Sequence, residues 1–175
     1  PGGFVSGTIE LGVCYLAYRY RNIRIFLFII CVCATIASCL LLWLLPRSAK
    51  SGLLVAITFL PSFGGAYAIL MGLQIANTAG YTKRSVTSAG LFMAWCLGNF
   101  VGPLLFKQED APISSPGFGV VVAGSAAAVV LSVVYLFVCR FENRKRDRAG
   151  LSEAYDHAYN DDLTDRTNKQ FRYVT

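Results

Sequence analysis

Among the polar side chains inside the long apolar runs of this sequence, four are candidates for chemistry that proceeds away from bulk water. Glu10 is the only acid within such a run, and Tyr67, Gln74 and Asn99 occupy two later runs. A carboxyl group in such a position could bind a cation or carry a proton, and the phenol and amides could hydrogen-bond a small solute. The plainer alternative is that Gln74 and Asn99 bond only to neighbouring helices and that Glu10 lies in interfacial water.

The spacing of these side chains favours a helix that lines a cavity. Tyr67 and Gln74, followed by Asn77 and Tyr81, recur near seven-residue and then three- to four-residue intervals, which places them on one helical face. Small residues occupy a different face of the same run. A helix that is packed on one side and wet on the other is expected to line an aqueous cavity. Asn77 and Tyr81 lie near its end and could instead meet headgroups.

The sequence shows no set of residues for enzymatic catalysis or metal binding. It contains no Ser-His-Asp set, no paired acids within an apolar run and no phosphate-binding glycine loop. His157 is the only histidine, and the six cysteines lie in apolar runs without metal-ligand spacing. We therefore expect neither an enzyme nor a metal or cofactor site.

The elements that position the polar residues are predicted to be membrane helices. Of the 175 residues, 55% are hydrophobic and only 15% charged, and the mean hydropathy is +0.52, whereas soluble domains carry about 25% charged residues. This composition excludes a disordered chain and disfavours a cytosolic enzyme. The net charge of +6 does not indicate nucleic acid, because the basic clusters end apolar runs; the expected partner is the lipid bilayer.

An all-α integral membrane fold with five spanning helices is predicted, because a span needs about 20 largely apolar residues. The chain is then a helical bundle over 1–140 and a polar tail over 141–175, in which a short interfacial helix near 141–158 is possible. Pro61 is expected to kink the third span. The five spans lie at about 3–18, 24–45, 52–77, 86–106 and 118–139.

The basic residues near the span ends predict the orientation of the chain. Ten lie on one side and three on the other, which by the positive-inside rule places the tail in the cytoplasm and residues 107–117 outside. The ten are Arg19, Arg21, Arg24, Lys83, Arg84, Arg140, Arg144, Lys145, Arg146 and Arg148, and the three are Arg47, Lys50 and Lys107.

Small residues at four-residue spacing predict close helix packing. They include Gly64 and Gly72 in the third span, and Gly90, Gly98 and Gly102, followed by Pro103, in the fourth. Such a face lets two backbones approach closely in a membrane. We expect both helices to belong to a tight bundle.

Three motifs resemble one family. The run 77–84 reads NTAGYTKR, 98–103 reads GNFVGP, and the tail reads DLTD at 162–165 followed by N-x-x-F-R-Y at 168–173. In this order they resemble the fungal allantoate permease-like anion:cation symporters of the major facilitator superfamily. Tyr81 stands where that family usually has His.

This resemblance covers nearly the whole chain and implies its place in a larger fold. The five spans would match the last five of twelve helices, so that the N-terminal half and the first helix of the second half are missing from this sequence, which begins at Pro1. Such a piece should not transport alone. Arg19, Arg21 and Arg24 would belong to a degenerate copy of the superfamily's cytoplasmic loop motif, with Tyr18 in place of its usual Asp. Asn77, Gly80, Thr82, Lys83 and Arg84 would form a second cytoplasmic motif.

The resemblance also implies a function. It predicts part of a secondary transporter in the plasma membrane that moves a small organic anion, such as allantoate, nicotinate or a related vitamin, with a proton by alternating access. The alternative is a small multi-span interaction protein or a non-transporting remnant, in which the polar residues only hold helices together.

Overall fold

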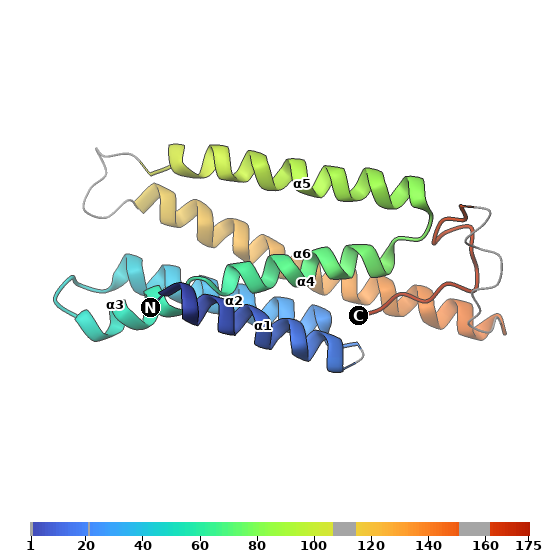
Figure 1. The fold of residues 1–175 in the computed structure, drawn as a ribbon, viewed down its shortest axis with the longest axis horizontal. Coiled ribbons are helices and arrows are strands. Elements are labelled where there is room, and N and C mark those ends of the chain that lie inside the picture. The colour runs from blue at the N-terminus through green and yellow to red at the C-terminus, as the bar shows by residue number, and fades with distance from the viewer. Residues whose placement is uncertain (1, 21, 107–114, 151–161) are drawn as a thin grey trace.

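Six helices occupy the residues that the computed structural model describes, which are 2–20, 22–106, 115–150 and 162–175. They run lengthwise in one elongated bundle, and Figure 1 shows that α2, α4 and α6 lie inside it, with α1 and α5 on opposite sides. In chain order the helices are α1 (Gly2–Arg19), α2 (Arg24–Leu44), α3 (Lys50–Phe59), α4 (Ser62–Asn77), α5 (Tyr81–Leu104) and α6 (Ser115–Arg148).

The centre of the bundle is α2, the most continuously apolar helix of the chain. It packs against both α4 and α6. One buried cluster joins Ile25 to Leu73 and Leu136, and a second joins Cys31 and Val32 to Ala66. Burying these side chains against one another fixes the three helices as a unit.

The predicted kink at Pro61 is present and divides the third span into α3 and α4. Proline has no N–H to donate, and the chain makes one tight turn there before the helix resumes at Ser62. The turn is held by hydrogen bonds from the Gly64 N–H to the Pro61 carbonyl at 2.9 Å and from the Leu60 N–H to the Ala56 carbonyl at 2.9 Å. Together α3 and α4 are long enough to cross a membrane.

Four stretches of the described residues have the length and composition of a membrane span: Arg24–Leu44, Lys50–Asn77, Tyr81–Leu104 and Pro116–Arg148. The chain is thus an all-α, multi-pass membrane bundle. The remaining predicted span is the shorter helix α1, which packs along α4. That α1 also crosses the membrane stays a prediction.

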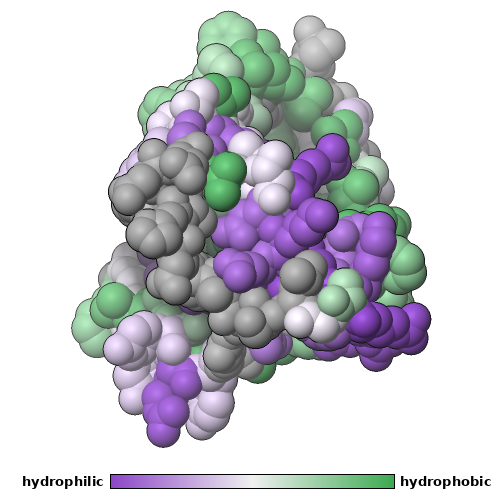
Figure 2. Space-filling view, turned by 90° about the vertical axis from the view of Figure 1, so that its right-hand side faces the viewer, coloured by the Kyte–Doolittle hydropathy of each residue, from purple (hydrophilic) through white to green (hydrophobic). Residues whose placement is uncertain are grey.

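Two helices extend beyond their apolar runs. The fourth span was expected from residue 86, whereas α5 begins at Tyr81, and the fifth was expected to end at 139, whereas α6 continues to Arg148. Hydropathy locates only the length of a helix that lies within the lipid. Polar turns outside the lipid continue the same backbone hydrogen-bond pattern, so the helix is longer than its apolar run. Figure 2 shows the resulting polar surface at this end of the bundle, with apolar side chains at its periphery.

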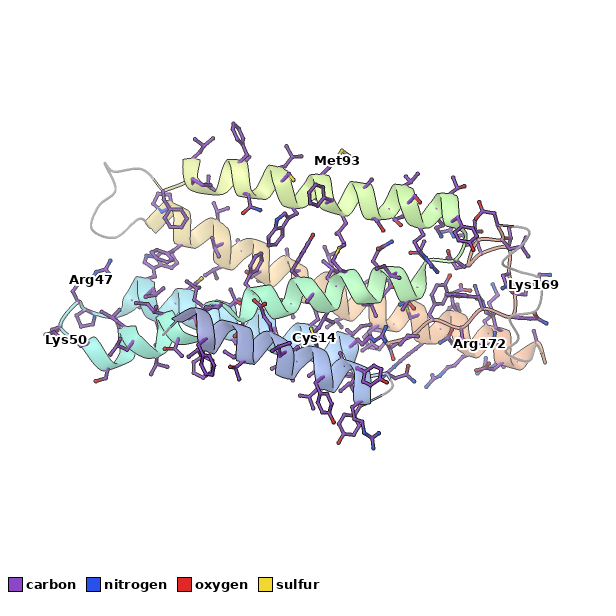
Figure 3. All side chains as sticks on the ribbon, in the orientation of Figure 1. Cys14, Arg47, Lys50, Met93, Lys169 and Arg172 are labelled. Carbon is purple, nitrogen blue, oxygen red and sulfur yellow. The ribbon has the colours of Figure 1, made fainter. Side chains whose placement is uncertain are left out.

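α5 is the least packed helix. None of its residues is buried, and Met93 lies on its outer face (Figure 3). Its main aromatic contact to α4 is Trp95, which stacks on Phe63 at a ring-centroid distance of 5.5 Å and packs at a tilt against Tyr67 at 4.0 Å. Among the described residues, therefore, little besides α4 holds the middle of α5.

The small-residue faces make fewer contacts than tight packing requires. A Cβ placed on Gly64 would meet the Glu10 side chain, so α1 and α4 do approach closely there. A Cβ on Gly72, Gly90, Gly98 or Gly102 would meet nothing within 4 Å in the described residues. The packing role of these four glycines and of Pro103 stays a prediction about partners outside those residues.

Candidate functional site

Residues 162–175 form a segment that we call the strap. It crosses the end of the bundle at which α4 ends, α5 begins and α6 ends, far from the short helix α3 (Figure 1). Because Arg19, Arg24, Lys83, Arg84 and Arg140 lie at this end, we call it the basic end. The sequence predicted only a polar tail here, whereas the structure shows a built site.

The strap begins by capping the start of α5. The Asp162 carboxylate accepts hydrogen bonds from the Tyr81 N–H and from the Thr82 hydroxyl, the latter at 2.8 Å. The first N–H groups of a helix have no partners within the helix and carry the positive end of its dipole, so a carboxylate there is stabilising. Gly80, with φ of 87°, makes the turn from α4, and a Cβ on it would lie 3.1 Å from the Asp162 carbonyl oxygen.

The second acid of the strap, Asp165, is buried and forms an ion pair with Lys83 in the first turn of α5. Its other oxygen accepts a hydrogen bond of 2.8 Å from the Tyr173 hydroxyl. Burial by itself would raise the pKa of the Asp165 carboxyl, but the bonds from Lys83 and Tyr173 outweigh it and hold that pKa below its usual range. Burial and the bond to Asp165 raise the pKa of Tyr173 to about 12.

Two asparagines hold the backbone of consecutive strap residues. Asn143 of α6 donates to the Tyr173 carbonyl at 2.8 Å and accepts from the Tyr173 N–H at 2.9 Å. Asn77 of α4 does the same with Val174, at 2.8 and 2.7 Å, and also donates to the Tyr135 hydroxyl at 2.8 Å. Each side-chain amide thus bonds both the backbone N–H and the backbone carbonyl of one strap residue, as a neighbouring β-strand would.

Arg146 of α6 completes the attachment. Its guanidinium donates to the carbonyls of Asp165, at 2.8 Å, and Phe171, and it lies over the Tyr173 ring at 4.9 Å from the ring centroid. Phe171 itself is buried. The planar guanidinium has five N–H donors and can therefore bond both carbonyl oxygens at once.

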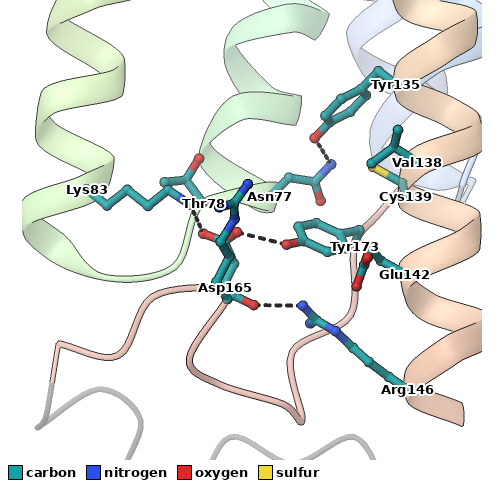
Figure 4. A pocket seen from close by; sticks show the side chains of 11 residues that line it. Asn77, Thr78, Lys83, Tyr135, Val138, Cys139, Glu142, Arg146, Asp165 and Tyr173 are labelled. Carbon is teal, nitrogen blue, oxygen red and sulfur yellow. Dashed lines mark hydrogen bonds and ion pairs between the residues drawn. The ribbon is translucent and has the colours of Figure 1, made fainter.

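A pocket of about 480 Å³ lies between the strap and the bundle (Figure 4). The buried thiol of Cys139 lines it together with Tyr135 and Glu142, and Asp165 and Tyr173 line it from the strap. It carries charges of both signs, since Lys83, Arg146 and Arg166 line it with Glu142 and Asp165. The strap thus forms one wall of the pocket that Cys139 lines.

A second, mainly apolar cleft of about 700 Å³ separates α5 from α2, α4 and α6. Gln74 lines it and bridges to α5, donating to the Thr87 hydroxyl at 2.6 Å and accepting from the Ser88 hydroxyl at 3.1 Å. Gly90 and Ala94 of α5 also face this cleft. The predicted cavity residue Gln74 is thus at a cleft, where it joins two helices.

The other three predicted cavity residues lie elsewhere. Glu10 is half-buried on α1 beside Gly64 of α4. Tyr67 packs at a tilt against Trp95 between α4 and α5. Asn99 is exposed and donates to the Trp95 carbonyl of its own helix at 2.9 Å. The structure does not bring these four residues to one point.

The predicted motif residues divide into two groups. Asn77, Gly80, Thr82 and Lys83 all contact the strap, whereas Arg84 donates twice to the Thr78 carbonyl at the end of α4, at 3.0 and 3.1 Å. Of the loop arginines, exposed Arg19 lies over the Tyr20 ring and Arg24 begins α2, while Arg21 lies outside the described residues.

Sequence reasoning missed the partners of the first group, Asp162, Asp165, Asn143, Arg146 and Tyr173, as site residues. For Asp162, Asp165 and Tyr173 the usable signal was the joint presence of the 77–84 and 162–173 motifs. Two distant polar motifs at the same side of a membrane are candidates for direct contact, and these two form it.

Comparison with known proteins identifies relatives along nearly all of the chain. An uncharacterized transporter of Schizosaccharomyces pombe is 32% identical over 95% of this chain and 34% of its own length. The MFS-type transporter cnsL of Penicillium expansum is 31% identical over 100% of the chain and 36% of its length. Allantoate permease of Saccharomyces cerevisiae is 31% identical over 82% of the chain and 27% of its length. The chain therefore spans about a third of the length of these relatives. No protein-family profile matches it, and neither does any solved structure.

Proposed function

This chain belongs to the fungal transporters of the major facilitator superfamily that include allantoate permease, and we propose that it supplies the last five of twelve spanning helices of a secondary transporter. The five are α1, α2, the α3–α4 pair, α5 and α6. The likeness along almost the whole chain supports this, as does the bundle of long apolar helices.

The basic end is proposed to face the cytoplasm. Arg47 and Lys50 lie at the opposite end of the bundle from Lys169 and Arg172 (Figure 3). Of the ten basic residues that the sequence assigns to the other side, the nine that the structure describes lie in or beside the helix ends on the strap side. That asymmetry is the pattern by which membrane proteins are oriented. The resemblance favours the plasma membrane.

The proposed cargo is a small organic anion moved together with a proton, and the observation that carries this proposal is the position of Glu10. Its carboxyl group lies half-buried midway along α1, against Gly64 of α4. An ionised Glu10 would repel an organic anion, whereas a protonated one would not. Proton binding and anion binding then favour each other, which is the requirement for symport. Tyr67, Gln74 and Asn99 are the further candidates for contact with the cargo.

The cleft beside α5 is proposed to hold another helix of the same half. The relatives are nearly three times as long as this chain, and each half of such a transporter has six helices. Gly90 and Ala94 offer that helix a face without bulky side chains. The exposed glycines of α5 would obtain their packing partner in the same way.

Uptake by the full-length transporter in reconstituted vesicles tests the function, with allantoate as the first probe and nicotinate as the second. An inward proton gradient should drive accumulation of the anion. Glu10→Gln should abolish that accumulation but leave exchange of labelled anion between two solutions of equal composition. Asp147→Asn is the matched control, because Asp147 is an exposed carboxylate at the end of α6.

Two results would contradict the proposal. Unchanged gradient-driven uptake by Glu10→Gln would exclude Glu10 as the proton carrier. The absence of uptake for every small anion tried would favour the interaction protein over the transporter.

A further inference from the structure

We propose that the strap is a releasable lock on the basic ends of α4, α5 and α6. Closed, it makes the three helix ends one unit and forms one wall of the pocket that Cys139 lines. Released, it frees the start of α5 and opens that pocket. The lock itself does not depend on the proposed transport function; only its use in the cell rests on that function.

The strap contacts every helix end around it through separate residues. Asp162 and Asp165 hold the start of α5, Asn77 holds Val174 at the end of α4, and Asn143 and Arg146 hold the strap on α6. The contacts of α5 with the core helices are otherwise few. The strap is therefore the link between the start of α5 and the end of α6.

The strap can open without unfolding the bundle. Its attachments are mostly hydrogen bonds and ion pairs, with Phe171 as its buried apolar residue. The buried clusters around Ile25 and Cys31 contain no strap residue. Segments held by few apolar contacts open at a lower free energy than the core does, so opening should be local.

The central fastening is the ion pair between Lys83 and Asp165. The Asp165 side chain is 6% exposed, whereas Asp147, which pairs with Arg172 at the rim of the strap, is 65% exposed. Removing a buried charge-assisted bond should shift the opening equilibrium strongly, and removing an exposed pair should shift it little. The two acids thus form a matched pair of test sites.

Cys139 is a native reporter of the closed state, because its thiol is buried and lines the pocket of which the strap forms one wall. In a full-length protein in which Cys139 is the only cysteine, a charged, membrane-impermeant maleimide is applied from the basic end. Asp165→Asn should raise the labelling rate about tenfold or more, since the lost bond governs local opening. Asp147→Asn should stay within about twofold of the parent protein.

Movement of α5 is measured separately with a pair of spin labels at Val86 of α5 and Phe137 of α6, both exposed. Asp165→Asn should broaden the distance distribution between them, and Asp147→Asn should not. If Asp165→Asn fails to reach the membrane, Tyr173→Phe, which removes only one bond to Asp165, should shift both measurements in the same direction by less.

Unchanged Cys139 labelling in Asp165→Asn would overturn the lock. Faster labelling with an unchanged distance distribution would overturn it as well, because the strap would then cover the pocket without holding α5. Neither measurement involves a cargo or a proton, so a failure of the transport proposal would leave both interpretable.

Discussion

Asn77, the last residue of α4, forms two hydrogen bonds to the backbone of Val174, which lies 97 positions later in the chain. The same amide donates to the Tyr135 hydroxyl of α6. One buried side chain thus joins two helices to the strap. Any substitution there affects three elements together.

Asn77→Ala is expected to lower the stability of the protein by about 2–4 kcal/mol, because it leaves the Val174 backbone groups and the Tyr135 hydroxyl without their partner. The measurement is the unfolding free energy in detergent. Asn99→Ala is the control: Asn99 is exposed and bonds within its own helix, so its replacement should cost no more than about 0.5 kcal/mol. Equal losses at both positions would contradict the role of Asn77.

Gly80→Ala is expected to destabilise the start of α5. The backbone at Gly80 has φ of 87°, which costs a residue with a Cβ roughly 1–2 kcal/mol, and the added methyl would press on the Asp162 carbonyl. Gly72→Ala, in an open position within α4, should be neutral or slightly stabilising in this chain. Thermal unfolding of the two variants compares them. A large loss for Gly72→Ala in the full-length protein would instead reveal a helix packed on that face.

The strap is expected to stay closed from about pH 4 to pH 10. Asp165 has a lowered pKa in the folded protein, so its contribution is complete above the ordinary value of 3.8 and is lost as the pH falls through the lowered pKa. Tyr173 has a raised pKa, so its contribution is complete below 10 and is lost as the pH rises towards about 12. Mobility of a spin label at exposed Lys169 should therefore be flat across neutral pH and rise at both extremes. A rise between pH 5 and 9 would contradict this assignment.

Gly64→Ala is expected to impair proton coupling although Glu10 itself is not replaced. Its new methyl group would meet the Glu10 carboxyl, which must then shift. Gradient-driven uptake by the full-length transporter should fall towards the level of Glu10→Gln. Gly12→Ala, on α1 with nothing near its Cβ, should retain parental uptake. Equal uptake by Gly64→Ala and Gly12→Ala would show that the contact between Gly64 and Glu10 has no part in proton coupling.

Composition and apolar run length predicted the fold class and most helix positions. Lipid requires every spanning backbone group to bond within its own helix, so about 20 apolar residues specify a span almost alone. The kink at Pro61 follows from proline's missing N–H and was predicted as well. The fourth span was predicted to begin at 86 and the fifth to end at 139, whereas α5 begins at Tyr81 and α6 ends at Arg148, because hydropathy does not register the polar turns.

The motifs pointed to residues at the basic end but not to the segment that these residues contact. Asn77, Gly80, Thr82 and Lys83 were expected at a cytoplasmic motif, and the structure shows each of them against the strap. Spacing within one helix indicates which side chains share a face. It carries no information about a segment that returns from more than 80 positions away.

The sequence by itself therefore determined a multi-pass helical bundle, its kink and a family of transporters, since these depend on local composition and on motifs read in order. Only the tertiary structure decided that the polar tail is a strap, that Asp165 meets Lys83 and that Glu10 lies against Gly64. The physical reason is that these are contacts between distant segments. Their existence depends on how the helices pack, and packing is fixed by the whole bundle rather than by any one stretch of it.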